Sequence, residues 1–171
     1  MSRTDAMEIF LQPGEYFVGD ADYRIRTLLG SCVSITLWHA ARRIGAMSHF
    51  LLATRGGPPN DVPDARYGDE ALWLLERDLL RVNVRSAECE AKIFGGGDMF
   101  PNQSRKAVLN VGQKNGEAAR WLLRSHGIPI VSESLFGIGH RQVIFDISSG
   151  NVWSRQVKPV DDSVADTRKI A

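Results

Sequence analysis

Two strand-like runs joined by a short basic connector constrain the fold most strongly. Residues 31–38, SCVSITLW, are rich in β-branched and aromatic side chains, and a second apolar run, IGAMSHFLL, extends from Ile44 to Leu52. The connector at 40–43 reads AARR, which is short enough for a tight return of the chain. This pattern predicts a β-hairpin. Its first strand would carry Cys32 and its second His49.

Other segments show strand patterns of the same kind. Residues 1–13 are interpreted as a lead-in. The further predicted strands are residues 23–28, 91–94 and 128–133, and a terminal hairpin of 142–147 and 152–157 turning at SSGN, 148–151.

Two helices are expected. Over 65–81, helical spacing predicts one apolar face, formed by Ala71, Leu72, Leu75, Leu79 and Leu80. A second helix is expected over 115–126, with Asn115 as its N-cap and Gly127 just after its end.

The sum of these elements is a mixed α/β (α+β) fold. The chain has 171 residues, which suits one domain, expected over 1–160 with a polar tail at 161–171. The Gly/Pro-rich segment 54–64 predicts a long loop. Such a loop can gate or bind a substrate, or simply be a solvated surface loop.

Composition argues against several function classes. The formal net charge is +1, from 21 basic and 20 acidic residues, so nucleic acid and anionic membrane are not expected partners. No apolar run approaches membrane-spanning length, and the N-terminus has acidic residues where a signal peptide needs apolar ones. We therefore expect a cytoplasmic protein without membrane insertion.

The two cysteines and four histidines show no metal-binding spacing. We expect neither a metal nor an organic cofactor. A reducing cytoplasm also argues against a structural disulfide between Cys32 and Cys89.

Cys32 and His49 are the leading candidates for chemistry. If they lie on neighbouring strands, Cβ atoms about 4.5–5.5 Å apart would let thiol and imidazole touch. An adjacent imidazole turns a thiol into a reactive thiolate and can then protonate a leaving group. Gly30 and Ser31 are small and would let a substrate approach the sulfur. The alternative is that both residues are ordinary core side chains, since cysteine is among the most buried residue types.

The remaining candidates are weaker. Cys89 lies between glutamates, which raise a thiol pKa. His39 ends a strand, and His126 fits a cation at a helix C-terminus. His140, in a Gly-rich loop, is the main rival of His49. The glycines at 95–97 lack the spacing of a phosphate-binding loop, which favours a tight turn under a packed neighbour.

Several motifs in order resemble the chemoreceptor glutamine deamidase family, CheD. They extend over nearly the whole chain, with Tyr67 opening the first helix. The motifs are PGEYFV at 13–18, LLGSCV at 28–33, GAMSHFLL at 45–52, IFGGGDMF at 93–100, NVGQKN at 110–115, GIPIV at 127–131, GHRQVIFD at 139–146 and SGNV at 149–152.

The resemblance implies an enzyme, a protein-glutamine glutaminase that hydrolyses glutamine side chains of chemoreceptor cytoplasmic domains to glutamate and thereby tunes chemotaxis. It also implies a fold similar to toxin deamidases, with a β-sheet core and helices packed outside. In that fold, Cys32 is implied as nucleophile and His49 as base. Backbone N–H groups of Cys32 or of the 95–97 loop would hold the oxyanion. A thioester intermediate would also be reachable from a methyl ester, which predicts slow esterase activity.

The family's third member is a threonine upstream of the cysteine. Without gaps it aligns with Arg26, whereas Thr27 is the neighbouring threonine. Offsets of five and six residues point to opposite faces of a regular strand, so a bulge near Gly30 would be needed to bring Thr27 to the site. Thr27 is the preferred candidate. Ser31, Ser48 and a backbone carbonyl are the alternatives.

Two other functions remain open at this point. The family also binds CheC-type phosphatases, so the chain could be a regulatory binding module of the chemotaxis pathway without catalysis. A generic cysteine protease or amidase would instead cleave backbone amides.

Overall fold

The computed structural model describes residues 5–57, 62–101 and 110–159. Within these ranges the chain forms nine strands, two α-helices and one short 3₁₀ helix, Ser86–Glu88. The strands are β1 (Met7–Leu11), β2 (Tyr16–Gly19), β3 (Tyr23–Leu29), β4 (Val33–His39), β5 (Ile44–Ser48), β6 (Glu90–Gly95), β7 (Ile130–Leu135), β8 (His140–Asp146) and β9 (Val152–Val157).

The strands form two sheets. The four-stranded sheet has the order β1-β3-β8-β9, and the five-stranded sheet has the order β2-β5-β4-β6-β7. The predicted hairpins β4–β5 and β8–β9 are both antiparallel, as expected. Two pairs, β1 with β3 and β6 with β7, are parallel.

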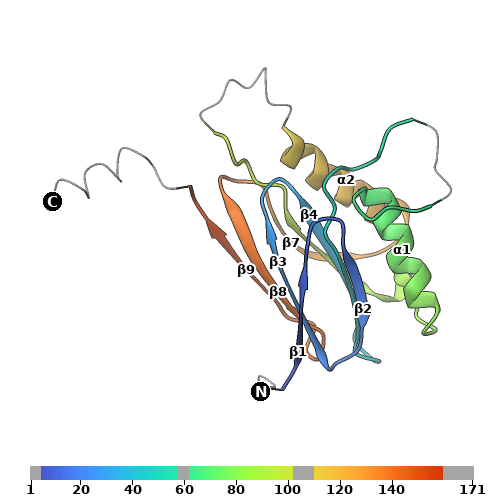
Figure 1. Ribbon diagram of the computed structural model, residues 1–171. Helices are drawn as coiled ribbons and strands as arrows, with labels where there is room; N and C mark the ends of the chain where they lie inside the picture. Colours follow the sequence, from blue (N-terminus) through green and yellow to red (C-terminus); the bar gives the residue numbers. More distant parts are fainter. Residues whose placement is uncertain (1–4, 58–61, 102–109, 160–171) are drawn as a thin grey trace.

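The sheets and helices form three layers (Figure 1). Both helices cover one face of the five-stranded sheet, and the four-stranded sheet packs on its other face. One apolar core lies between the helices and the five-stranded sheet and includes Leu72, Leu75 and Ile93. The other core lies between the sheets and includes Leu29 and Phe145. The predicted α+β class, with a β-sheet core and helices outside, is confirmed.

The first helix, α1 (Gly68–Leu80), starts later than predicted, after Tyr67 at its N-cap. Four of the five expected apolar-face residues are buried, but Leu80 is 58% exposed. Leu80 belongs to the last turn, and Leu74 is buried instead. The face therefore follows the helical period until the final turn.

The second helix, α2 (Val111–Ser125), begins four residues before the predicted start. Its N-cap is Asn110, whose side chain accepts a hydrogen bond from the Gln113 N–H at 3.1 Å. The prediction of Asn115 as N-cap is therefore wrong, because Asn115 lies inside the helix and is 1% exposed. Gly127 follows the C-cap residue His126, as predicted.

The interpretation of residues 1–13 as a lead-in is also wrong. Met7–Leu11 forms β1, which pairs in parallel with β3 and places Leu11 beside Thr27. The strand β2 pairs with β5 and was likewise not predicted. Part of the predicted 54–64 loop, at 58–61, and the predicted tail at 161–171 lie outside the described residues.

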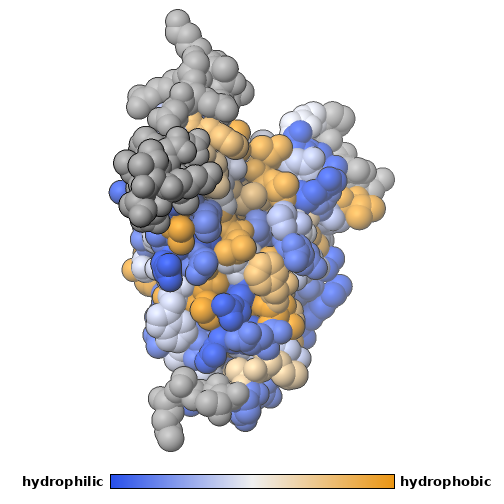
Figure 2. Space-filling model, turned by 60° about the vertical axis from the view of Figure 1, so that its left-hand side comes forward, coloured by the Kyte–Doolittle hydropathy of each residue, from blue (hydrophilic) through white to orange (hydrophobic). Residues whose placement is uncertain are grey.

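No described helix covers the outer face of the four-stranded sheet. Phe10, Leu28 and Trp153 on its strands are each about half exposed. On the side where β9 lies in Figure 1, hydrophobic residues form separate patches between hydrophilic ones (Figure 2). In the described part of the chain, no helix is long and apolar enough to cross a membrane.

Candidate active site

The chain passes from one sheet to the other at residues 30–32. Leu29 ends β3 in the four-stranded sheet, and Val33 begins β4 in the five-stranded sheet. Cys32 therefore lies in the crossing turn, partly exposed, and packs against the core between the sheets. Cys32 is therefore not enclosed by the core, in contrast to Cys89, which is buried.

Hydrogen bonds hold all three carbonyl groups of this turn. The N–H groups of Gly97 and Gly96 donate to Gly30 O and Cys32 O, each at 2.9 Å. The side-chain amide of Asn115 donates to Ser31 O at 3.0 Å. The N–H of Cys32 donates to no other described residue. It is therefore available for a developing oxyanion.

The glycine loop, residues 95–97, packs directly against the crossing turn. A Cβ atom at Gly95, which has φ of +115°, would collide with the carbonyl oxygen of Cys32. This agrees with the tight-turn interpretation of residues 95–97. The expectation that this loop supplies oxyanion donors is not supported at Gly96 and Gly97, because their N–H groups are already bonded.

His49 follows the end of β5 and is 1% exposed. Its backbone is fixed on the β2 side, where the Gly14 N–H donates to His49 O at 2.8 Å and the His49 N–H donates to Glu15 O at 3.2 Å. The next residue, Phe50, exchanges two backbone hydrogen bonds with Val33, at 3.0 and 3.1 Å. The motif PGEY at 13–16 thus helps to hold the imidazole in place.

The β4–β5 register places Cys32 and His49 on one face of the sheet, but not directly opposite each other. Thr36 pairs with Met47, and the Val33–Phe50 bridge continues that register. His49 is therefore the diagonal neighbour of Cys32. The Cα atoms of such diagonal neighbours on paired strands are about 7–8 Å apart, so long side chains can still reach each other. The expected direct cross-strand pair is corrected to a diagonal one.

A buried hydrogen-bond chain fixes the imidazole. Thr27 Oγ1 lies 2.7 Å from His49 Nδ1 and donates to the carbonyl oxygen of Leu11 at 2.8 Å. A hydroxyl has one proton, and the Leu11 carbonyl can only accept. The Nδ1 atom must therefore carry the proton that Thr27 accepts. This leaves Nε2 unprotonated and able to act as a base.

The route to Thr27 differs from the expected one. Thr27 is 2% exposed and points into the core between the sheets, whereas Arg26 points outward to Glu8, at 3.5 Å. Strand parity does not relate Thr27 to Cys32, because the chain changes sheets between them. A bulge at Gly30 is therefore not needed. Ser48 Oγ accepts from the Ile35 N–H at 3.3 Å, and in the described part of the chain the imidazole of His49 has Thr27, not Ser48, as its hydrogen-bond partner.

Burial favours the neutral forms of both leading candidates. It raises the pKa of the Cys32 thiol, against a smaller lowering by its own backbone N–H. Burial also lowers the pKa of His49 to about 4, with a smaller opposing effect of Glu15. The resting pair is then thiol and imidazole rather than the expected thiolate and imidazolium. Proton transfer would accompany attack on a substrate.

The other candidates lie in different surroundings. Cys89 is buried, and burial, followed by the charge of Glu88, raises its pKa to about 11. His39 contacts Glu88 at 3.4 Å, and His126 Nδ1 lies 2.7 Å from Glu76. His140 is the first residue of β8. Because side chains alternate along a strand, His140 and the buried Arg141 lie on opposite faces of the four-stranded sheet. None of these is brought to Cys32.

Sequence reasoning missed three supporting groups. The Leu11 carbonyl belongs to the unpredicted strand β1. Asn115 was assigned to a helix cap. The buried guanidinium of Arg141 donates to Gly95 O at 3.0 Å and to Phe136 O at 2.6 Å, and burial lowers its pKa. A short apolar run at 7–11 was the available signal for β1. Nothing local marked the other two.

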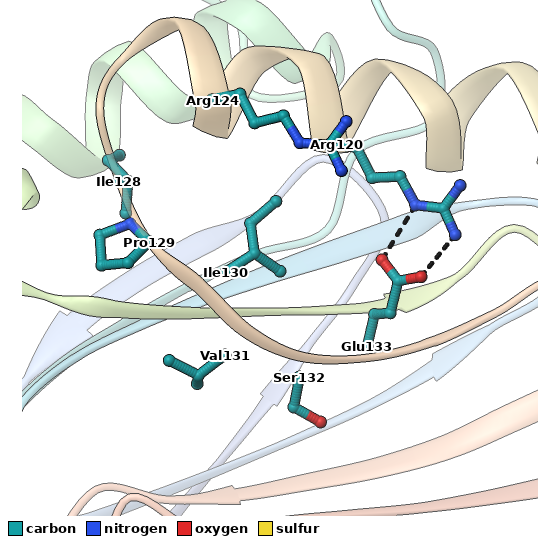
Figure 3. A pocket seen from close by; sticks show the side chains of 8 residues that line it. All are labelled: Arg120, Arg124, Ile128, Pro129, Ile130, Val131, Ser132 and Glu133. Atoms are coloured by element: carbon teal, nitrogen blue, oxygen red, sulfur yellow. Dashed lines mark hydrogen bonds and ion pairs between the residues drawn. The ribbon is translucent and has the colours of Figure 1, made fainter.

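A separate groove of about 620 Å³ lies between the C-terminal half of α2 and β7 (Figure 3). Arg120 and Arg124 line it from the helix, and residues 128–133 line it from the other side. Arg120 crosses toward Glu133, with Nε 2.9 Å from a carboxylate oxygen. The lining contains no thiol or imidazole, so the groove differs in chemistry from the site at Cys32. In the described ranges, no group of three or more His, Cys, Asp or Glu side chains is placed to hold a metal ion.

Comparison with known protein families gives a match over more than half of the chain. A family model described as "CheD chemotactic sensory transduction" matches residues 51–156. That range includes α1, the glycine loop and α2, but it begins just after His49.

Individual relatives extend the similarity to the site. The chain is 65% identical over 161 residues to the "Probable chemoreceptor glutamine deamidase CheD 2" of Albidiferax ferrireducens, covering 94% of this chain and 93% of the relative. Because 161 of 171 residues take part, the aligned region includes residues 27–49. Identity is 43% over 148 residues to "CheD 1" of Chromobacterium violaceum, covering 86% and 77%. It is 41% over 164 residues to the CheD protein of Pseudomonas syringae pv. tomato, covering 95% and 96%.

Proposed function

This chain belongs to the CheD family, and on that premise we propose how its residues carry out the family's reaction. It is a chemoreceptor glutamine deamidase: it hydrolyses side-chain amides of chemoreceptor glutamines to glutamate and releases ammonia. In our proposal Cys32 is the nucleophile, His49 the general base and acid, and Thr27 the residue that orients His49.

The first half of the reaction forms a thioester. Cys32 Sγ attacks the amide carbon of the glutamine, and its proton passes to His49 Nε2. The Cys32 N–H stabilises the oxyanion. When the tetrahedral intermediate collapses, the carbon–nitrogen bond breaks and His49 returns the proton to the leaving nitrogen, which departs as ammonia.

The second half is hydrolysis. A water molecule gives a proton to His49 Nε2 and attacks the thioester carbon. The carbon–sulfur bond then breaks, and the proton returns from His49 to the sulfur, which restores the thiol. The product is a glutamic acid side chain, which gives its remaining proton to the solvent at neutral pH and so carries a new negative charge. Both halves need an unprotonated Nε2 at the start.

The observation that carries this proposal is the chain from Leu11 O through Thr27 Oγ1 to His49 Nδ1, at 2.8 and 2.7 Å. It selects the imidazole tautomer that the reaction requires. A purely structural histidine would also need a hydrogen-bond partner when buried. It would require neither this particular tautomer nor a position on the same sheet face as a partly exposed cysteine.

Mass spectrometry of a chemoreceptor cytoplasmic fragment tests the proposal. The fragment is incubated with the wild-type protein, with Cys32→Ala and with Cys89→Ala as the matched control. We expect site-specific Gln→Glu conversion by the wild type and by Cys89→Ala, and none by Cys32→Ala. Conversion by Cys32→Ala would overturn the assignment of the nucleophile. Cleavage of the fragment's backbone would favour a protease.

The proposal extends to location and partners. The substrate segments belong to receptor cytoplasmic domains, so we place the enzyme in the cytoplasm. We also propose a CheC-type phosphatase as a partner, on the ground of the family resemblance. If binding to receptor or phosphatase persisted without any conversion by the wild type, a regulatory binding module would replace the deamidase.

A further inference from the structure

We propose that Asn115 is a positioning residue of the deamidase site, whose side-chain amide joins the two segments that carry Cys32 and His49. The inference rests on the proposed function. It assigns a task to a residue that neither touches the substrate nor exchanges a proton.

The evidence is a pair of buried hydrogen bonds. Asn115 Nδ2 donates to Ser31 O at 3.0 Å and to Leu51 O at 2.7 Å. Both partners are carbonyl oxygens, so the atom that faces them must be the NH₂ group, which has two protons to donate. Asn115 is 1% exposed, so water does not compete for these bonds.

The bridge lies where the backbone ladder ends. Val33 and Phe50 exchange the last pair of backbone hydrogen bonds between the two segments. Beyond that pair, the next ladder bond would run from the Leu52 N–H to Ser31 O, but the Leu52 N–H donates to Arg66 O at 3.2 Å instead. The Asn115 amide therefore replaces the missing ladder contact, next to Cys32 on one side and two residues after His49 on the other.

The helix that carries Asn115 is seated firmly. Gly112, one turn earlier, packs its backbone directly on the glycine loop, where a Cβ atom would collide with the carbonyl oxygens of Gly96 and Gly97. That loop also holds the carbonyls of Gly30 and Cys32. The crossing turn is thus fixed twice, by the loop and by the helix resting on it.

The separation of thiol and imidazole should depend on this amide. Misplacement of reacting groups by about 1 Å can cost about 100-fold in rate. In Asn115→Asp the shape is kept, but a carboxylate cannot donate to either carbonyl. We expect kcat for Asn115→Asp and Asn115→Ala to fall by about 10- to 100-fold, with KM changed by less than about 3-fold.

A control for effects on stability comes from the same helix. Asn110 caps α2 but contacts neither Cys32 nor His49 through its side chain. Asn110→Ala should lower the melting temperature by about 2–4 °C, as expected for a lost cap in a chain of this size. It should keep kcat within about 2-fold. If both variants lose kcat in proportion to their melting temperatures, Asn115 is merely structural and the inference fails.

A second readout does not need deamidase activity. The rate of Cys32 alkylation by iodoacetamide, followed by peptide mass spectrometry across pH 5–10, reports on the thiol and its base. We expect the profile of Asn115→Asp to shift relative to the wild type and that of Asn110→Ala to coincide with it. An unchanged profile in a folded Asn115→Asp would overturn the inference. If wild-type alkylation depends on His49 but no receptor is deamidated, the proposed function fails while the positioning role stands.

Discussion

The chain has two cysteines, and they sit in regions built on opposite sides of the five-stranded sheet. Cys32 lies in the turn that joins the sheets, partly exposed, beside the imidazole that Thr27 orients. Cys89 is 1% exposed in the core beneath the helices, where its sulfur lies 3.7 Å from Arg85 O. Both thiols have a raised pKa.

This comparison shows that a raised thiol pKa does not distinguish the proposed nucleophile, Cys32, from Cys89. What differs is the exposure of the residue, a neighbouring imidazole with a fixed tautomer and a backbone N–H that donates to no other described residue. The predictions below test each of these differences, from the largest expected effect to the smallest.

Removal of the two thiols should have opposite consequences. Cys32→Ala should lower the deamidation rate by about 10³-fold or more, with little loss of stability, because it removes the nucleophile. Cys89→Ala should keep the rate within about 2-fold but lower the free energy of unfolding by about 1–2 kcal/mol, because it leaves a small cavity. Initial rates and urea unfolding measure the two effects. Equal rate losses in both variants would abolish the contrast.

The buried imidazole should make the fold sensitive to acid. His49 binds a proton near pH 6.5 in the unfolded chain but near pH 4 in the folded one. The unfolded state therefore binds more protons between these values, and stability falls as pH drops from about 6.5 to 4, by about 3 kcal/mol.

Urea unfolding at several pH values measures this loss, with His49→Asn as the comparison. The variant should lose less stability than the wild type over the same range, because it lacks the titrating group. Parallel pH dependences would mean that His49 is accessible to protons in the folded state.

Loss of the orienting hydroxyl should weaken the base without removing it. Thr27→Val keeps the shape but leaves His49 Nδ1 and Leu11 O without their shared partner, so we expect a fall in kcat of about 10- to 100-fold. Thr27→Ser should recover most of the rate. Arg26→Ala, at an exposed neighbour, is the control and should change the rate by less than about 2-fold. A larger effect at Arg26 than at Thr27 would reverse their assignment.

The charge beside Cys89 should matter least. Glu88 is the second cause of the raised Cys89 pKa, after burial, and its side chain is 53% exposed. Glu88→Gln should change the free energy of unfolding by less than about 0.5 kcal/mol and leave the deamidation rate unchanged. Iodoacetamide should label the buried Cys89 slowly in the wild type and equally slowly in this variant. Fast labelling in this variant would show that charge, rather than burial, protects the thiol.

Local patterns were sufficient for much of the fold. The β-branched runs predicted β3, β4 and the two hairpins, and helical spacing predicted α1. The short strand β1 is not predicted because its pairing with β3 is parallel and the strand β2 lies between them in the sequence, so no hairpin turn marks the pair. The predicted start of α2 is four residues late because Gly112 interrupts the pattern of a helix interior in its first turn.

The candidate site was predictable in its residues but not in its geometry. Cys32 and His49 follow from residue type and context, and Thr27 from the resemblance. The change of sheets at Gly30 could not be predicted, because a strand-like run does not reveal which sheet it joins. For the same reason the parity argument about Thr27 is wrong, because it treats Thr27 and Cys32 as residues of one strand. The bonds of Asn115 to Ser31 and Leu51 also depend on tertiary packing, so the sequence does not predict them.

The position of Cys32 in the crossing turn also bears on when the site is assembled during folding. The groups of the proposed site come from positions 11, 27, 32, 49 and 115, and bringing them together requires both sheets and α2 to be in place. Contacts between such distant positions form late when a chain folds. We therefore expect Cys32 in a newly made or partly folded chain to lack the proposed reactivity, which would appear together with the finished tertiary structure.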